Sequence, residues 1–273
     1  MKVDYISDLH VDFYFEKEEI TIEEFKATKL YEIFKDKEGE VLVIAGDIGH
    51  YNKQNLFILK AIKEFFNYKK IFFVLGNHDY YLLNNLMIEK YNSNSINRIN
   101  DMKNLCDEEK DIHLLTGNII EYKGIKFGGT GMWYDGVYLQ RLNLRMTKEK
   151  VNEIWEDKMR DAGSIYGIQN YKTLFQIEIE NLRNCYEKSD ILITHVNPSI
   201  NPSHTHRKYI LNELNGFYSF DGDYYLENTK AKYWIFGHTH KNIEYDVYNT
   251  KVICNPLGYP HENIDFELES FVV

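Results

Sequence analysis

Five short apolar runs, each followed at once by a polar motif, constrain the fold of this chain more than any other feature of its sequence. The runs are rich in Val, Ile, Leu, Phe and Tyr. Such runs are typical of strands that are covered on both faces of a largely parallel sheet. We expect strands at KVDYIS (2–7), EVLVIAG (40–46), KKIFFVLG (69–76), DILITH (190–195) and KYWIFG (232–237).

Helical spacing between the early runs indicates an α/β protein. The helical positions are Leu56, Leu59, Ile62, Phe65 and Phe66 in one segment, and Ile96, Ile99, Met102 and Leu105 in the next. From about residue 112 the pattern changes to short strands with turns, and we expect hairpins at Lys123-Gly124 and Asn249-Thr250. The final segment, DFELESFVV, is expected to close a second sheet.

A helical insert separates the early strands from DILITH. Thr147 can cap a helix that carries Val151, Ile154, Trp155 and Met159 and ends at Gly163, and a second helix carries Tyr171, Leu174, Leu182 and Cys185. Helices inserted between strands of a sheet often cover a site as a cap. We therefore expect a single domain over residues 1–273, with a helical insert at about 135–188.

Composition restricts the partners that this chain can have. The formal charge of −10 repels nucleic-acid backbones, so an extended nucleic acid is disfavoured as a partner. No apolar run of about 18 residues occurs, and two aspartates stand where a signal peptide would need an apolar core. We expect a soluble, cytoplasmic protein that does not enter a membrane, and its oligomeric state stays open.

The polar motifs at the strand ends are expected to meet in one crevice, because the carboxyl ends of parallel strands share one edge of a sheet. Each motif alone is also explained by a helix cap or a polar turn. Five together, with glycines ahead of three of them, are much harder to explain by capping. The residues that can hold a metal are Asp8, His10, Asp47, Asn77, His195, His238 and His240.

Nitrogen and oxygen ligands without thiolate suit manganese, iron, zinc or nickel better than calcium. Seven ligands are too many for one such ion that keeps a position open for substrate. They suit two divalent transition-metal ions that share a carboxylate, which is the usual arrangement for hydrolysis of phosphoric esters.

The ordered motifs DLH, GD, GNHD, TH and GHTH resemble those of the calcineurin-like dinuclear metallophosphoesterases, and the resemblance spans residues 1 to about 258. It implies a four-layer αββα sandwich of two mixed sheets flanked by helices. It also implies that Asp8, His10 and His240 hold one metal, that Asn77, His195 and His238 hold the other, that Asp47 bridges, that His78 is catalytic, and that Asp79 orients His78.

The motifs also narrow the activity within that family. His10 separates the chain from purple acid phosphatases, and His50 stands where the serine/threonine phosphatase branch has the aspartate that pairs with its catalytic histidine. We expect a phosphodiesterase that acts on a nucleotide or another small phosphodiester through a hydroxide held by two metal ions, with manganese favoured. The alternatives are a phosphomonoesterase, a short-RNA nuclease and, from another class, a non-catalytic interaction module with the same fold.

Candidate substrate contacts lie near the proposed ligands. The stretch NPSHTHRKY places His204, His206 and Arg207 shortly after His195, and RLNLR places Arg141 and Arg145 in the insert. These side chains are candidates for binding a second phosphate or a nucleotide. The alternatives are a solvated face for the two arginines and a structural role for the two histidines.

Overall fold

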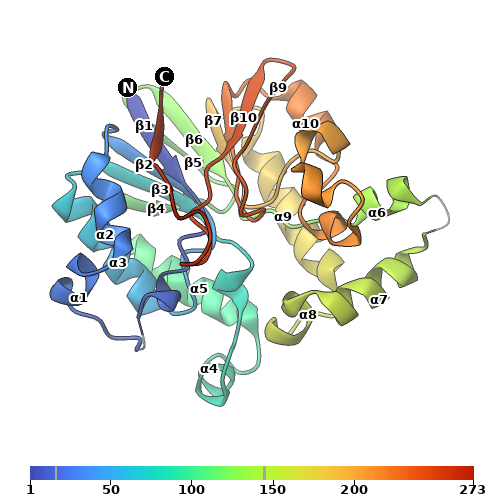
Figure 1. Ribbon diagram of the computed structural model, residues 1–273, viewed down its shortest axis with the longest axis horizontal. Coiled ribbons are helices and arrows are strands. Elements are labelled where there is room, and N and C mark those ends of the chain that lie inside the picture. The colour runs from blue at the N-terminus through green and yellow to red at the C-terminus, as the bar shows by residue number, and fades with distance from the viewer. Residues whose placement is uncertain (16, 144–145) are drawn as a thin grey trace.

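The computed structural model describes residues 1–15, 17–143 and 146–273, and it contains two mixed β-sheets packed face to face (Figure 1). The first sheet has five strands in the order β11-β1-β2-β3-β4. Strands β1 to β4 run parallel to one another, whereas β11 pairs with β1 in the antiparallel direction. The bounds are β1 Lys2–Ile6, β2 Val41–Ala45, β3 Lys70–Val74, β4 Ile112–Leu114 and β11 Glu269–Val272.

The second sheet has six strands in the order β5-β6-β7-β8-β10-β9. Its central strands β6, β7, β8 and β10 are parallel, and an antiparallel strand flanks them at each edge. The bounds are β5 Ile119–Tyr122, β6 Ile125–Gly129, β7 Ile191–Ile193, β8 Tyr233–Ile235, β9 Ile243–Val247 and β10 Thr250–Cys254.

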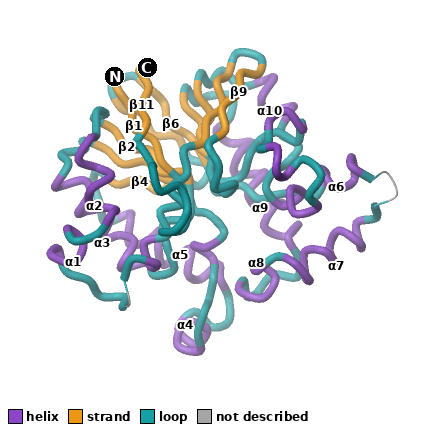
Figure 2. Tube along the Cα trace, in the orientation of Figure 1, coloured by secondary structure: helices purple, strands orange, loops and turns teal. Residues whose placement is uncertain are grey.

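Helices cover the outer faces of both sheets (Figure 2). Helices α3 and α5 pack on β3 and β4 of the first sheet, and α9 packs on β6 of the second. The bounds are α1 Ile22–Lys26, α2 Lys29–Ile33, α3 Asn52–Phe65, α4 Asn85–Lys90, α5 Ser95–Asp107, α6 Val137–Leu142, α7 Lys148–Lys158, α8 Arg160–Ser164, α9 Tyr171–Cys185 and α10 Asp223–Asn228.

An apolar layer between the two sheets holds them together. Phe72 of β3 stacks on Phe127 of β6, with 4.1 Å between ring centroids, and Val43 and Ile193 are fully buried in the same cluster. Burying side chains of this size contributes about 1.5–3 kcal/mol each. The predicted α/β architecture of two mixed sheets flanked by helices is therefore confirmed.

Three details differ from the sequence-based expectation. The C-terminal segment joins the first sheet as β11 rather than the second, because the outer edge of β1 is open there while β9 already occupies the corresponding edge of the second sheet. Phe271 on β11 stacks on Tyr233, with 3.9 Å between ring centroids.

The second difference is the β9–β10 turn. It lies at Tyr248 and Asn249, one residue earlier than predicted, because Thr250 already pairs with Val247.

The third difference is in the insert. Thr147 caps α7 as predicted, since its hydroxyl accepts a hydrogen bond from the backbone N–H of Lys150 at 3.2 Å. The helix does not continue to Gly163, because Met159 adopts extended backbone (φ −97°, ψ 126°) and α8 begins at Arg160. Within the described ranges, no helix is both long enough and apolar enough to span a bilayer.

Candidate metal centre

The polar motifs of five strands meet at one edge of the paired sheets. Strands β1, β2 and β3 bring their motifs from the first sheet, and β7 and β8 bring theirs from the second. The side chains of all seven candidate ligands are at least 85% buried. The sandwich therefore gathers residues that are up to 232 positions apart in the chain.

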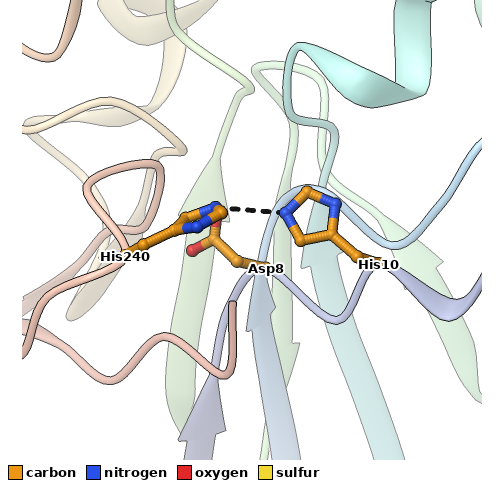
Figure 3. Close-up of side chains that lie close together, drawn as sticks. All are labelled: Asp8, His10 and His240. Carbon is orange, nitrogen blue, oxygen red and sulfur yellow. Dashed lines mark hydrogen bonds and ion pairs between the residues drawn. The ribbon is translucent and has the colours of Figure 1, made fainter. Parts of the chain in front are cut away.

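One group consists of Asp8, His10 and His240 (Figure 3). The Nε2 atoms of His10 and His240 face each other at 3.1 Å, and His240 Nε2 lies 3.4 Å from a carboxylate oxygen of Asp8. Nδ1 of His10 is buried and has no hydrogen-bond partner. Imidazole nitrogens that face each other beside a carboxylate are a donor set that suits a divalent transition ion.

A second group consists of Asp47, His195 and His238. Oδ2 of Asp47 lies 3.4 Å from His195 Nε2, and the amide oxygen of Asn77 lies 3.1 Å from the same nitrogen. The same Asp47 oxygen lies 3.8 Å from His10 Nε2 in the first group. The position of Asp47 between the groups fits a carboxylate shared by two ions.

Hydrogen bonds on the far ring nitrogens support this fit. Nδ1 of His195 lies 2.8 Å from the carbonyl oxygen of Ala45, and Nε2 of His238 lies 2.9 Å from the carbonyl oxygen of Phe217. Nδ1 of His240 lies 2.6 Å from Glu262. A ring that donates from one nitrogen to an oxygen presents a lone pair at the other, which is the usual second shell of metal-binding histidines. The residues present therefore fit two divalent ions.

The backbone at the site is held in an uncommon conformation. Asp8, His10, Asp47, His238 and His240 have φ between 45° and 70°, in the left-handed region that non-glycine residues seldom adopt. Such conformations persist where the surrounding structure fixes them, and they cluster at functional sites.

The glycines ahead of the motifs allow the chain to approach the ligands closely. A Cβ atom at Gly76 would lie 2.1 Å from Oδ1 of Asp47, and one at Gly46 would lie 2.3 Å from Nδ1 of His195. Larger residues are therefore excluded at both positions.

Burial and neighbouring charges shift the pKa values in the cluster. Burial lowers the pKa of His10 to about 4 and lowers that of His238. Burial alone would raise the pKa of Asp47, yet the imidazoles of His195 and His78 hold it well below its usual value. The Asp47 carboxylate, despite burial, raises the pKa of His195 to about 9. Because metals bind neutral imidazole, ion binding would release the proton from His195.

His78 lies beside the cluster, and its ring is held by residues that the sequence analysis did not assign to it. Its Nδ1 lies 2.9 Å from Nε2 of His50, and its Nε2 lies 3.3 Å from the hydroxyl of Tyr259. The expected orienting partner, Asp79, is turned away. The Asp79 carboxylate accepts hydrogen bonds from the backbone N–H of Gly76 at 2.8 Å, that of Gly49 at 3.4 Å, and the Asn55 amide at 3.3 Å. Asp79 therefore stabilises the backbone at Gly49 and Gly76 and does not contact the ring of His78 through a hydrogen bond that the structure shows.

A buried carboxylate from the insert holds the Asn77 amide. Asp161 of α8 accepts from Asn77 Nδ2 at 2.9 Å and from the Tyr134 hydroxyl at 2.6 Å, and it also accepts from the Tyr81 hydroxyl. These contacts orient Asn77 so that its oxygen faces His195. No motif in the sequence pointed to Asp161, because it reaches the site from the first turn of a helix outside the sheets.

A cavity of about 300 Å³ opens beside the ligands. Asp47, Asn77, His78 and His240 lie on its inner side, and Lys158 and Arg160 of the insert also line it. Its wall is completed by aromatic side chains, Tyr81, Tyr209, Tyr218 and Tyr259. The sequence alone also allowed Tyr259, in the stretch NPLGYPHE, to approach the crevice. It gave no signal for Lys158, Arg160 and the other tyrosines, because single residues in loops and helix ends carry no pattern.

Of the predicted substrate contacts that fall within the described ranges, the structure brings none to this cavity. His204 stacks on Tyr245, with 3.9 Å between ring centroids, and its Nδ1 lies 2.8 Å from the Ser199 hydroxyl. His206 is exposed, and its Nδ1 accepts from the backbone N–H of Lys208 at 3.3 Å. Arg207 is exposed beside it, Arg141 pairs with Asp221 at 3.2 Å, and Arg145 lies outside the described residues.

Two mixed sheets that carry buried His and Asp clusters at their shared edge define a metal-dependent hydrolase of the metallophosphoesterase type. Residues 1–242 match the model of the calcineurin-like phosphoesterases, and the chain belongs to that family. The resemblance seen in the motifs is thus confirmed, and the protein is a metal-dependent phosphoesterase.

Two known proteins resemble this chain over more than nine-tenths of its length. An uncharacterized protein of Acanthamoeba polyphaga mimivirus is 29% identical over 277 residues, which cover 91% of this chain and 88% of that protein. The crystal structure of the phosphopantetheinyl hydrolase from Mycobacterium tuberculosis superposes with a TM-score of 0.73 at 15% identity, over 98% of this chain and 95% of that one. This second likeness concerns the fold alone.

Proposed function

We propose that this protein hydrolyses a small phosphodiester, such as a nucleotide ester, at a centre of two divalent metal ions. In this proposal, one ion is held by Asp8, His10 and His240, the other by Asn77, His195 and His238, and Asp47 is shared. Manganese is the favoured metal on the mixed nitrogen and oxygen ligands, with iron, zinc and nickel as alternatives.

The observation that carries the proposal is the cavity of about 300 Å³ beside the ligands. Its volume is that of a small-molecule site. Candidate ligands at the strand ends line one side of it, and the cationic side chains of Lys158 and Arg160 from the insert line the other. A phosphoryl group placed against the cluster would leave Arg160 and the tyrosine wall to receive the remaining part of a small ester.

The chain's own residues have distinct proposed roles in the reaction. When bound, two divalent ions lower the pKa of a water molecule and polarise the phosphoryl oxygens. His78 presents Nε2 towards the cavity, and with hydrogen on both ring nitrogens it can donate the Nε2 proton to the leaving oxygen or steady the charged phosphoryl group. Arg160 can bind a non-reacting phosphoryl oxygen by charge-assisted hydrogen bonds. Tyr259, whose hydroxyl lies 3.3 Å from Nε2 of His78, keeps that nitrogen directed at the cavity before substrate binds.

We also propose that residues 1–273 form a single domain whose helical insert, at about 135–188, caps the site. Lys158 and Arg160 line the cavity from the junction of α7 and α8. Asp161, one residue further, contacts Asn77 directly. The cap therefore supplies substrate contacts and supports the metal site at the same time.

The test is a turnover screen of the manganese-loaded protein. Cyclic nucleotides, dinucleotides, phosphodiester headgroups, a phosphopantetheinyl ester and phosphomonoesters would be compared, together with bis-nitrophenyl and mono-nitrophenyl phosphate. We expect a higher kcat/KM for at least one small diester than for every monoester. Preference for a monoester would replace the diesterase proposal by a phosphomonoesterase, and cleavage of a labelled short RNA alone would favour a nuclease.

A further inference from the structure

We propose that His50 and Asp12 are positioning residues that fix the ring of His78 for its reaction. This inference rests on the proposed function of His78. The three residues form a continuous row, in which Asp12 contacts His50 and His50 contacts His78. The row takes the place of the direct contact with Asp79 that the motif had suggested.

The contacts in the row are short and shielded from water. Oδ2 of Asp12 lies 2.6 Å from Nδ1 of His50, and Nε2 of His50 lies 2.9 Å from Nδ1 of His78. The side chains of Asp12 and His50 are 8% and 4% exposed. Hydrogen bonds in such surroundings are electrostatically stronger than in water, so each member restricts the next.

A second hydrogen bond fixes the position of His50 relative to Asp12. Oδ1 of Asp12 accepts the backbone N–H of His50 at 3.0 Å, while Oδ2 accepts from the ring of the same residue. The rings of His50 and His78 lie nearly parallel, with 5.0 Å between centroids and an angle of 16°. His50 therefore has little freedom to turn, and its Nε2 keeps a fixed position beside His78.

The loop behind the row is also fixed. The guanidinium of Arg98 is fully buried and donates to the carbonyl oxygens of Gly49 and His78, both at distances of 2.8–2.9 Å. Arg98 thus ties the residue before His50 to the backbone of His78. The two rings are held in place both through their side chains and through the segments that carry them.

The row decides which nitrogen of each ring carries a proton. The Asp12 carboxylate only accepts hydrogen bonds, so it selects the form of His50 with hydrogen on Nδ1 and a lone pair on Nε2. That lone pair in turn selects hydrogen on Nδ1 of His78. Exchange of a proton with the cavity is then confined to Nε2 of His78, the nitrogen that faces Tyr259.

Serine proteases offer a physical precedent for the expected size of the effect. Replacing the buried carboxylate behind their catalytic imidazole by an amide preserves the geometry but permits the wrong tautomer, and turnover falls by about 10⁴-fold. Here one more ring stands between the carboxylate and the reacting imidazole. We therefore expect smaller losses, of about 10- to 100-fold in kcat, from changes in Asp12 or His50.

The experiment compares His50→Ala, His50→Gln and Asp12→Asn in the manganese-loaded protein. We expect kcat to fall by about 10- to 100-fold in H50A and D12N with KM and metal content unchanged. H50Q should recover part of the activity, because its amide oxygen can accept from Nδ1 of His78. Asp4→Asn is the matched control. Asp4 is a buried carboxylate hydrogen-bonded to Tyr68 at 2.7 Å in β1, and its change should leave kcat as it is.

A double-mutant cycle separates positioning from a general structural role. In a His78→Ala background, the change of His50 to Ala should cause no further loss of kcat, because its effect passes through His78. Equal losses in both backgrounds would overturn the proposal. So would full activity of both H50A and D12N.

A spectroscopic readout keeps the inference testable apart from activity. Long-range ¹⁵N–¹H spectra of the zinc-loaded protein should show hydrogen on Nδ1 of both His50 and His78, and the D12N variant should shift His50 towards hydrogen on Nε2. Hydrogen on Nε2 of His50 in the unaltered protein would contradict the row. If the unaltered protein hydrolyses no phosphoester while the Nδ1 forms are observed, the proposed function fails and the row remains.

Discussion

The ligand cluster and the wall of the cavity opposite it are built by different means. Every candidate ligand follows directly from the carboxyl end of a strand, and its side chain is largely buried. The opposite wall comes from the insert and from loops, and Lys158 and Arg160 are exposed to solvent. The cluster is thus fixed by two packed sheets, whereas the wall depends on where a few surface segments lie.

This difference indicates where function is constrained and where it can vary. The left-handed backbone at five candidate ligands permits few substitutions. Exposed cations at the end of a helix can be exchanged at little cost in stability. We therefore expect changes in the cluster to abolish the chemistry, and changes in the wall to alter the choice of substrate.

The largest effect is expected from Asp47→Ala. Its carboxylate lies between the two groups of ligands, 3.4 Å from His195 Nε2 and 3.8 Å from His10 Nε2. Removing it should release both ions and abolish hydrolysis. Metal content of the purified variant, measured by mass spectrometry, together with turnover under saturating manganese, checks this. Retention of two tightly bound ions would show that Asp47 is not shared.

His78→Ala should give the next largest loss. His78 also lies within reach of His10 and Asp47, in a third group of side chains that could hold an ion. If it is catalytic rather than a ligand, turnover should fall by about 10²- to 10⁴-fold while two ions stay bound. The same metal measurement decides between the two roles, since loss of an ion would make His78 a ligand.

Asp161→Ala tests whether the cap supports the cluster. Without this carboxylate, the Asn77 amide keeps only its hydrogen bond to the Tyr81 hydroxyl, at 2.9 Å. Its oxygen is then held less firmly towards His195, and affinity for one ion should fall by about 10- to 100-fold. Titration of the metal-free protein with manganese, followed by calorimetry, measures the change. Tyr134→Phe is the control, because it removes a hydroxyl from the other oxygen of Asp161 and leaves the contact to Asn77.

The sequence was sufficient to predict the α/β architecture, the family and the convergence of the strand-end motifs, although it placed the C-terminal strand in the wrong sheet. The reason is physical, because a strand end in a parallel sheet has a known position relative to its neighbours. Asp47 and His10 follow the neighbouring parallel strands β2 and β1, and the backbone N–H of His10 donates to the carbonyl oxygen of Asp47 at 3.0 Å. The contact of the His238 backbone N–H with the Asp8 carboxylate joins the two sheets and depends also on how they pack.

The remaining parts of the site depend on tertiary placement that no local pattern contains. His50, in the loop between β2 and α3, reaches His78, which follows the neighbouring strand β3. Glu262 reaches His240 from a turn near the C-terminus. The side chain of Asp79 follows the motif in sequence but turns to Gly76 and Asn55. The histidines after His195 were assigned to substrate by proximity in sequence, and His204 instead packs on Tyr245.

The smallest effect is expected on the cavity wall, from Arg160→Met. Arg160 lines the cavity, and its guanidinium lies 5.8 Å from the ring centroid of Tyr81. A hydrogen bond to a charged phosphoryl oxygen contributes about 1.5–3 kcal/mol to substrate binding, and each 1.4 kcal/mol changes the dissociation constant by a factor of about ten. Because solvent already screens this exposed arginine, we expect the lower limit, a rise in KM of about tenfold with kcat little changed. Steady-state kinetics on the best diester from the screen would measure it.

Arg141→Met is the matched control for Arg160→Met, because both arginines are exposed residues of the insert and only Arg160 lines the cavity. Arg141 pairs with Asp221 at the surface, where such a pair contributes about 0–1 kcal/mol to stability, so KM and kcat should both stay unchanged. An equal rise in KM for the two variants would mean that the insert acts through its general charge. A rise for R141M alone would place the substrate on a different face of the insert and would contradict the assignment of the wall.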